Sequence, residues 1–245
     1  MRNIIITGSS GSIGSALTSF FSKRKFNVIA VDSKFVTVNK RLKNVDYFVC
    51  DLSNSSSQKK LFSRLEKKYK TIHILLNVAG RIHNSLVLKR LGNGFKYHSY
   101  NNWKKVFNDN LNTSFLSSIN CTKLMMKDKK DKLIINFSSV SANGNIGQVA
   151  YSSAKSAIET MTKVMAMELS IFNIRVVAIS PGYFDTISTK KNMSDKEISK
   201  IISKTPSRRI GNENELIHLI YTIINNKFMN GKTYKIDGGL EFWRN

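Results

Sequence analysis

The feature that most constrains the fold is a glycine-rich segment near the start of the chain. Residues 4–6 form a short β-branched run, and residues 7–14 follow with the order Thr-Gly-Ser-Ser-Gly-Ser-Ile-Gly. Apolar residues then recur at helical spacing, as Leu17 and Phe21 do. This order of strand, turn and helix directs backbone N–H groups and a helix N-terminus toward a phosphate, as in dinucleotide-binding units. A tight turn without a ligand is the alternative.

An acidic residue follows this turn at a characteristic distance. Residues 28–31 form a second apolar run, and Asp32 ends it. An acid about 20 residues past the turn suits the ribose 2′-hydroxyl of NAD and repels the 2′-phosphate of NADP. Together with the strand before the turn, Asp32 therefore favours dinucleotide binding, with NAD as the cofactor.

The apolar runs along the whole chain predict one α/β domain. They occupy residues 4–6, 28–31, 72–76, 133–137, 174–179 and 233–236, and segments with helical periodicity separate them. This alternation predicts a Rossmann-like, doubly wound parallel sheet with helices on both faces. The 245 residues contain no linker, repeat or low-complexity tract. We therefore expect a single domain over residues 1–245.

The composition bears on partners and location. The net charge is +23 and the isoelectric point is near 10.1. The lysines are scattered and accompany many Asn and Ile residues, which is typical of drift in an AT-rich genome; a specific polyanion partner is the alternative. Cys50 and Cys121 lack metal-ligand spacing and read as core residues, so no metal site is expected. The opening apolar run is too short for a signal peptide or a membrane span, which predicts a soluble cytoplasmic protein without a membrane or specific nucleic-acid partner.

A tyrosine and a lysine four residues apart indicate acid–base chemistry. Tyr151 and Lys155 share one face if residues 150–170 are helical. A phenol with its ordinary pKa of about 10 is a poor acid or base at neutral pH, and an adjacent cation lowers that pKa. The pair alone is weak evidence, because a surface Tyr and Lys occur together on many helices.

With these motifs, the whole chain resembles the short-chain dehydrogenase/reductase family in its compact form, and its motif layout is similar to that of 3-oxoacyl-thioester reductases. The family's TGxxxGxG turn matches residues 7–14, except that Ser12 stands where the middle glycine is usual. Asp51 and Leu52 match the acid near the adenine ring, and residues 77–80 match the NNAG element. The resemblance implies that the cofactor is bound by Gly8, Ser10, Ser12, Ile13, Gly14, Asp32, Asp51, Leu52, Asn77, Ala79, Gly80, Tyr151, Lys155, Pro181, Gly182 and Thr186.

The resemblance also implies a catalytic set of Asn110, Ser139, Tyr151 and Lys155. Asn110 matches the asparagine that widens a helix turn and holds a water on the proton path. Ser139 matches the serine that binds the substrate oxygen, although it precedes Tyr151 by twelve residues, one fewer than is usual in the family. Ser138 has the usual count. We favour Ser139, because strand geometry fixes which side chain faces the site while loop deletions are easily absorbed.

Several functions fit these motifs. The leading interpretation is an NAD-dependent oxidoreductase that interconverts a small-molecule ketone and a secondary alcohol. A 3-oxoacyl-thioester reductase using NADPH is the alternative enzyme, against which Asp32 argues. A dinucleotide-responsive binding protein without turnover is the alternative from another class. Residues 81–102 form a longer loop than is usual in the family. Its basic residues His83, Arg90, Lys96 and His98 would suit an anionic substrate if the loop lines the pocket, and otherwise the loop is simply solvated.

The helices expected around residues 103–127 and 150–170 carry apolar residues on more than one face, as Phe115 and Ile119 illustrate. One face must cover the sheet, so the surplus predicts a second buried face. In the family such faces pair subunits, which implies a homotetramer, with a dimer as the next alternative. The alternative is that the surplus residues pack under the loop of residues 81–102.

Overall fold

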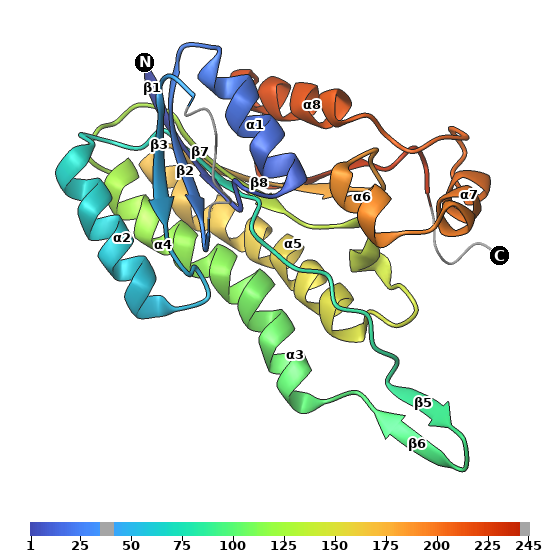
Figure 1. Cartoon of the computed structure of the whole chain (residues 1–245). Coiled ribbons are helices and arrows are strands. Elements are labelled where there is room, and N and C mark those ends of the chain that lie inside the picture. The colour runs from blue at the N-terminus through green and yellow to red at the C-terminus, as the bar shows by residue number, and fades with distance from the viewer. Residues whose placement is uncertain (35–41, 241–245) are drawn as a thin grey trace.

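The centre of the computed structural model, which describes residues 1–34 and 42–240, is a parallel β-sheet (Figure 1). Its strands are β1 (Arg2–Thr7), β2 (Phe26–Asp32), β3 (Val45–Val49), β4 (Ile74–Asn77), β7 (Lys132–Phe137), β8 (Ile174–Pro181) and β9 (Thr233–Ile236). These seven strands lie in the sheet in the order β3-β2-β1-β4-β7-β8-β9, and every neighbouring pair is parallel. The predicted α/β class is confirmed.

Helices cover both faces of the sheet (Figure 1). One face carries α1 (Ser12–Ser22) and α8 (Glu213–Asn225), and the other carries α2 (Ser55–Lys68), α4 (Thr113–Met125) and α5 (Val149–Leu169). Helix α3 (Tyr100–Phe107) runs through a π-helical turn (Asn108–Asn112) into α4, and the short helices α6 (Ile187–Asn192) and α7 (Asp195–Lys204) follow β8. Short 3₁₀ turns lie at Val140–Asn143 and Ser170–Phe172.

The core has two halves because successive residues of each strand face opposite sides of the sheet. Ile4 and Ile6 pack with Leu17 of α1 in one cluster, whereas Ile5 packs with Leu65 of α2 in the other. All these side chains are buried. This two-sided burial explains why the strands read as continuous apolar runs rather than as alternating ones.

The strand order reverses between β1 and β4, and a ligand-binding crevice is expected at their carboxyl ends. From β1 the chain builds outward through β2 and β3 to one edge, and from β4 through β7, β8 and β9 to the other. Doubly wound sheets bind their ligands where the order reverses in this way. None of the helices in residues 1–34 and 42–240 is long and apolar enough to span a bilayer.

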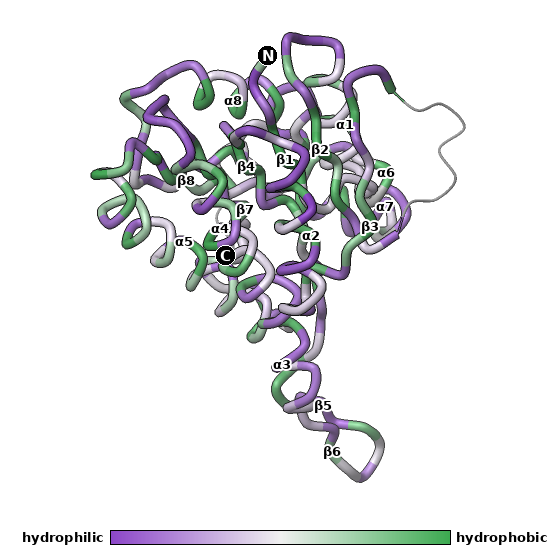
Figure 2. The backbone as a smooth tube through the Cα atoms, turned by 90° about the vertical axis from the view of Figure 1, so that its left-hand side faces the viewer, coloured by the Kyte–Doolittle hydropathy of each residue, from purple (hydrophilic) through white to green (hydrophobic). Residues whose placement is uncertain are grey.

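The segment after β8 and the expected loop of residues 81–102 both contain regular structure. Residues 187–205 hold α6 and α7, and a capping box between Ser194 and Glu197 begins α7. Residues 81–102 contain β5 (Leu88–Leu91) and β6 (Gly94–Tyr97), which pair as an antiparallel hairpin. Figures 1 and 2 show this hairpin projecting from the body of the molecule. Phe115 and Ile119 of α4 stay exposed, so the alternative that they pack under this segment is wrong.

Strand β3 was absent from the predicted apolar runs. Its five residues have the order Val-Asp-Tyr-Phe-Val, and only Phe48 is buried. It lies at the edge of the sheet beside β2. An edge strand packs few of its side chains, so its sequence carries little of the hydrophobic signal that marks the central strands.

Candidate active site

The glycine-rich turn joins β1 to α1 through close backbone contacts. Gly8 has a φ of 64°, and a Cβ on Gly14 would lie 2.1 Å from the carbonyl oxygen of Gly8. Glycine tolerates both conditions, so the N-terminus of α1 is held against the end of β1. Ser12 begins the helix, its first turn contains no acidic residue, and Ile13 packs against the core. The first N–H groups of a helix lack intrahelical partners and attract anions, so this turn fits a dinucleotide pyrophosphate.

Asp32 ends β2 beside this turn. One carboxylate oxygen accepts a hydrogen bond from the backbone N–H of Ser10 at 2.9 Å, and the other accepts one from the N–H of Ser33 at 2.7 Å. Within residues 1–34 and 42–240, no cation forms an ion pair with Asp32. The carboxylate is therefore fixed in place while its negative charge remains unneutralised.

The loop after β3 is organised by Asp51 and Leu52. The Asp51 carboxylate accepts hydrogen bonds from the backbone N–H of Ser53 at 3.0 Å and from its hydroxyl at 2.7 Å. The Leu52 carbonyl accepts one from the Gln58 side chain at 2.6 Å, and the Leu52 side chain is buried. These bonds hold the loop against α2 at the carboxyl edge of the sheet.

Asn77 supports the sheet through its side chain. The amide is buried and donates to the Ser118 hydroxyl at 2.9 Å and to the Asn136 side chain at 2.9 Å. These contacts tie β4 to α4 and β7. The amide nitrogen is therefore engaged inside the protein, whereas Oδ1 has no hydrogen-bond partner among the described residues, and the place of Asn77 in the cofactor site stays a prediction. The backbone N–H of Ala79 donates to the Thr7 hydroxyl at 3.1 Å and so aligns the ends of β4 and β1.

Asn110 lies in the π-helical turn between α3 and α4, as the family resemblance predicts for a widened turn. Its fully buried side chain donates to the carbonyls of Val106 at 2.9 Å and Arg81 at 3.0 Å. A Cβ on Gly80 would lie 2.6 Å from Oδ1 of Asn110 and 3.4 Å from Nζ of Lys155. Gly80 therefore leaves the space in which these two polar side chains approach each other.

The two serines after β7 have different surroundings. The Ser138 hydroxyl is buried and donates to Glu159 at 2.7 Å and to the Lys155 carbonyl at 3.2 Å. The Ser139 side chain hydrogen-bonds with the Tyr151 hydroxyl and also accepts from the backbone N–H of Ser141 at 3.1 Å. This geometry supports Ser139 as the serine that faces the reacting oxygen, although it is one residue closer to the tyrosine than is usual.

Burial opposes charge on both members of the Tyr-Lys pair. It raises the pKa of Tyr151 to about 12, against the lowering effect of the Ser139 hydrogen bond. Burial also lowers the pKa of Lys155 to about 8. Burial is therefore the largest influence on the tyrosine pKa and outweighs any lowering by the lysine. Nζ of Lys155 lies 5.6 Å from the centre of the Tyr151 ring and donates to the Phe137 carbonyl at 2.7 Å.

The segment after β8 is tightly packed. Pro181 ends the strand, and a Cβ on Gly182 would lie 2.7 Å from Cα of Asp237. Thr186 is buried and caps α6, its hydroxyl accepting from the backbone N–H of Thr189 at 3.0 Å. A contact between Thr186 and the cofactor stays a prediction, since its hydroxyl already serves the helix.

Tyr183, which no motif marks, lies near Tyr151, and Asn145 contacts Tyr183. The Tyr183 hydroxyl hydrogen-bonds with the Asn145 side chain, and charge on Tyr183 is one of the influences that raise the pKa of Tyr151. Asn145 in turn donates to the Gln148 side chain at 3.2 Å. The only signals in the sequence are positional, since Tyr183 follows the Pro-Gly pair and Asn145 lies in the loop between Ser139 and Tyr151.

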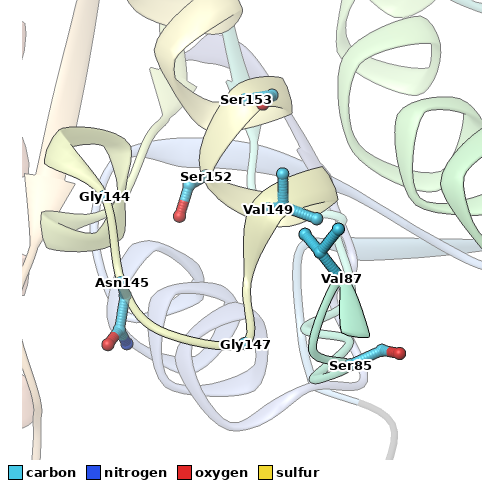
Figure 3. Close-up of a pocket in the computed structure, with 8 residues that line it drawn as sticks. All are labelled: Ser85, Val87, Gly144, Asn145, Gly147, Val149, Ser152 and Ser153. Carbon is cyan, nitrogen blue, oxygen red and sulfur yellow. The ribbon is translucent and has the colours of Figure 1, made fainter. Parts of the chain in front are cut away.

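A pocket of about 320 Å³ opens where the start of the 81–102 segment meets this loop (Figure 3). Its lining residues, none of them charged, are Ser85, Val87, Gly144, Asn145, Gly147, Val149, Ser152 and Ser153. The N–H of Ser85 donates to the Gly147 carbonyl at 2.7 Å and fixes the two walls together. The segment therefore lines this pocket. Its cations Arg90 and Lys96 lie on the exposed hairpin and do not line it, so a role for them in binding an anionic substrate stays a prediction.

Comparison with known proteins agrees with this geometry. The family model described as short chain dehydrogenase matches residues 2–197. The chain belongs to the short-chain dehydrogenase family. As a short-chain dehydrogenase it is an oxidoreductase that acts on an alcohol or ketone group with a nicotinamide dinucleotide.

Two relatives of this short-chain dehydrogenase carry the same name. It is 30% identical over 243 residues, covering 96% of each chain, to the 3-oxoacyl-[acyl-carrier-protein] reductase of Buchnera aphidicola subsp. Baizongia pistaciae. It is 29% identical over 245 residues, again covering 96% of each, to the enzyme of that name from Thermotoga maritima.

Solved structures share the fold closely. A 4-hydroxyisoleucine dehydrogenase complexed with NADH matches with a TM-score of 0.88 and 31% identity, over 98% of each chain. The ligand-free aldohexose dehydrogenase of Thermoplasma acidophilum matches with a TM-score of 0.85 and 25% identity, over 98% of this chain and 93% of its own.

Proposed function

We propose that this short-chain dehydrogenase uses NAD(H) to interconvert a ketone and a secondary alcohol. The observation that carries the cofactor choice is the carboxylate of Asp32 at the end of β2, which two backbone N–H groups hold and with which no cation of residues 1–34 and 42–240 forms an ion pair. Such a carboxylate accepts hydrogen bonds from a ribose 2′-hydroxyl and repels a 2′-phosphate. The solved relative that was complexed with NADH is consistent with this choice.

The residues along the crevice fit the cofactor from one end to the other. We assign the adenosine end to Asp32 and Asp51, the pyrophosphate to the turn of residues 8–14, and the nicotinamide end to Lys155, Gly182 and Thr186. When bound, the nicotinamide would supply a hydride to the substrate carbon or accept one from it.

Tyr151 serves as the proton donor in the reducing direction. With a pKa of about 12, its hydroxyl holds its proton at neutral pH, and a neutral phenol can donate to a substrate oxygen. Ser139 bonds the same hydroxyl and would bind that oxygen through its own O–H. Positioned donors of these kinds each contribute roughly 10²–10³-fold to rate.

After Tyr151 donates its proton, Lys155 stabilises the negative charge left on the phenolate, and Asn110 takes part in returning a proton to it. Loss of the proton leaves a phenolate on Tyr151, and the buried ammonium of Lys155 stabilises it electrostatically. The Asn110 side chain meets Lys155 beside Gly80, which places a second polar group between the lysine and the Arg81 backbone. We assign Asn110 the positioning of a water that returns a proton to the site.

Reduction of a 3-oxoacyl thioester with NADPH is the second candidate, and the printed names of the relatives favour it. Asp32 opposes it, because the 2′-phosphate of NADPH would meet a carboxylate that no cation neutralises within the described residues.

Turnover with a panel of substrates tests the proposal. NADH consumption is followed with uncharged ketones and with a 3-oxoacyl thioester, and each is repeated with NADPH. We expect ketone reduction with NADH, and none in the Tyr151→Phe variant. Turnover restricted to the thioester with NADPH would overturn the proposal in favour of the second candidate.

A further inference from the structure

The hairpin of residues 88–97, called the arm below, has an apolar face that no other part of residues 1–34 and 42–240 covers. All eight residues of β5 and β6 are exposed. The register pairs Leu88 with Tyr97 and Arg90 with Phe95, so these four side chains share one face. Phe95 is 59% exposed and Tyr97 is 70% exposed. In both views the arm extends away from the body (Figures 1 and 2).

The arm has little to stabilise it by itself. An isolated two-stranded hairpin is marginally stable in water. Its other face sets Lys89 directly opposite Lys96, and like charges at such positions are destabilising. An exposed apolar surface of this kind, joined to a basic one, is typical of an interaction site whose partner offers apolar and acidic groups.

The chain carries a second uncovered surface with the complementary chemistry. Val164, Met167, Glu168 and Ile171, called the helix patch, recur at helical spacing at the end of α5 and in the turn after it. Met167 is 69% exposed and Ile171 is 79% exposed. The helix patch contains the negatively charged Glu168, whereas the apolar face of the arm contains the positively charged Arg90. In the part of the chain that the structure describes, neither Glu168 nor Arg90 has an ion-pair partner.

The two surfaces lie at opposite ends of the same helix. The base of the arm adjoins the N-terminus of α5, since Val87 and Val149 line one pocket and Ser85 bonds Gly147. The helix patch lies at the C-terminus. Helix α5 has 21 residues, which corresponds to about 30 Å. The arm therefore does not reach the patch of its own chain, but a two-fold axis that sets two copies of α5 antiparallel brings each arm to the other copy's patch.

We propose that the arm is an assembly element that covers the helix patch of a second copy of this chain. Leu88, Phe95 and Tyr97 pack on the patch, and Arg90 pairs with Glu168 of the partner subunit. Charge complementarity supports this occupant. The chain has 39 basic and 16 acidic residues, so an exposed acid among apolar side chains is a scarce and specific target for a basic arm. The contact adds to the homotetramer expected from the family and does not depend on the cofactor or the substrate.

Disulfide trapping tests the contact directly. The native Cys50 and Cys121 are buried, so Arg90→Cys with Glu168→Cys supplies the accessible thiols. We expect the double variant, after mild oxidation, to give a covalent dimer on a denaturing gel, whereas the single variants stay monomeric. A monomer band from the oxidised double variant would overturn the proposal.

A charge swap measured by sedimentation equilibrium gives an independent readout. We expect Arg90→Glu and Glu168→Arg each to weaken self-association by about tenfold or more, and the two together to restore most of it. Lys96→Glu is the matched control, since it makes the same charge change on the opposite face of the arm. NADH affinity checks that each variant is folded. A wild-type monomer at micromolar concentration, or equal effects of Arg90→Glu and Lys96→Glu, would contradict the contact.

Discussion

Replacing the buried lysine by methionine should make the protein more stable while abolishing its activity. Lys155 is 4% exposed, and its ammonium donates to the Phe137 carbonyl at 2.7 Å. Methionine has a similar length and no charge to bury. The lysine is needed for chemistry but costs folding free energy, as buried charges do. Lys155→Met therefore separates the requirement for catalysis from the requirement for folding.

The size of the effect follows from the pKa of Lys155. Burial lowers it from 10.5 to about 8, and each tenfold change in proton affinity is worth about 1.4 kcal/mol, so the charged lysine costs roughly 3 kcal/mol at pH 7. Losing the hydrogen bond to the carbonyl offsets about 1.5 kcal/mol. We expect Lys155→Met to raise the free energy of unfolding by about 2 kcal/mol at pH 7.

The stability advantage of Lys155→Met over the wild type should decrease as the pH rises. Between pH 8 and 10.5 the folded protein releases the lysine proton before the unfolded chain does, so the unfolded chain binds more protons and the wild type gains stability. At about pH 10 we expect the two proteins to have nearly equal free energies of unfolding.

Urea unfolding of the cofactor-free proteins at pH 7 and pH 10 measures both quantities. Lys163→Met, on the exposed side of the same helix, is the control for a change of net charge and should show little difference at either pH. A Lys155→Met protein that is less stable than the wild type at pH 7, or a gain that does not decline with pH, would refute the reasoning.

Three further outcomes are expected. Tyr151→Phe should lower turnover by roughly 10²–10⁴-fold and change NADH affinity little, as measured by steady-state kinetics and fluorescence titration; retained turnover would mean that another group is the acid. Ser139→Ala should reduce turnover more than Ser138→Ala, whose main effect should be on thermal stability because Ser138 bonds Glu159; the reverse order would reassign the substrate-binding serine. Gly14→Ala should lower both NADH affinity and the melting temperature, because its Cβ would lie 2.1 Å from the Gly8 carbonyl oxygen; wild-type values for both would show that the turn is not packed as described.

The sheet could be predicted from the sequence because its central strands are buried on both faces. Runs such as residues 4–6 and 174–179 carry that burial in every residue, and the glycine-rich turn fixed where the first helix begins. The π-helical turn at Asn110 came from the family resemblance alone, since a single widened turn leaves no periodic trace.

Other features depend on three-dimensional surroundings. The raised pKa of Tyr151 could not be predicted, because the spacing of Tyr151 and Lys155 along the helix reveals neither how deeply the tyrosine is buried nor which atom the ammonium contacts. The side chain of Asn77 turns into the core toward Ser118, and its position in the motif gives no direction. The arm reads as a loop because exposed Leu88 and Phe95 follow no pattern of burial.

The central claim is that Asp32 makes this short-chain dehydrogenase an NAD enzyme, and parallel fluorescence titrations with NADH and NADPH test it most directly. NADPH should bind weaker by about tenfold or more, since placing like charges together costs over 1 kcal/mol. The Asp32→Asn variant keeps the size of the side chain and removes its charge. In this variant the affinities for NADH and NADPH should differ less than in the wild type. Equal affinities in the wild type, or tighter binding of NADPH, would contradict the account.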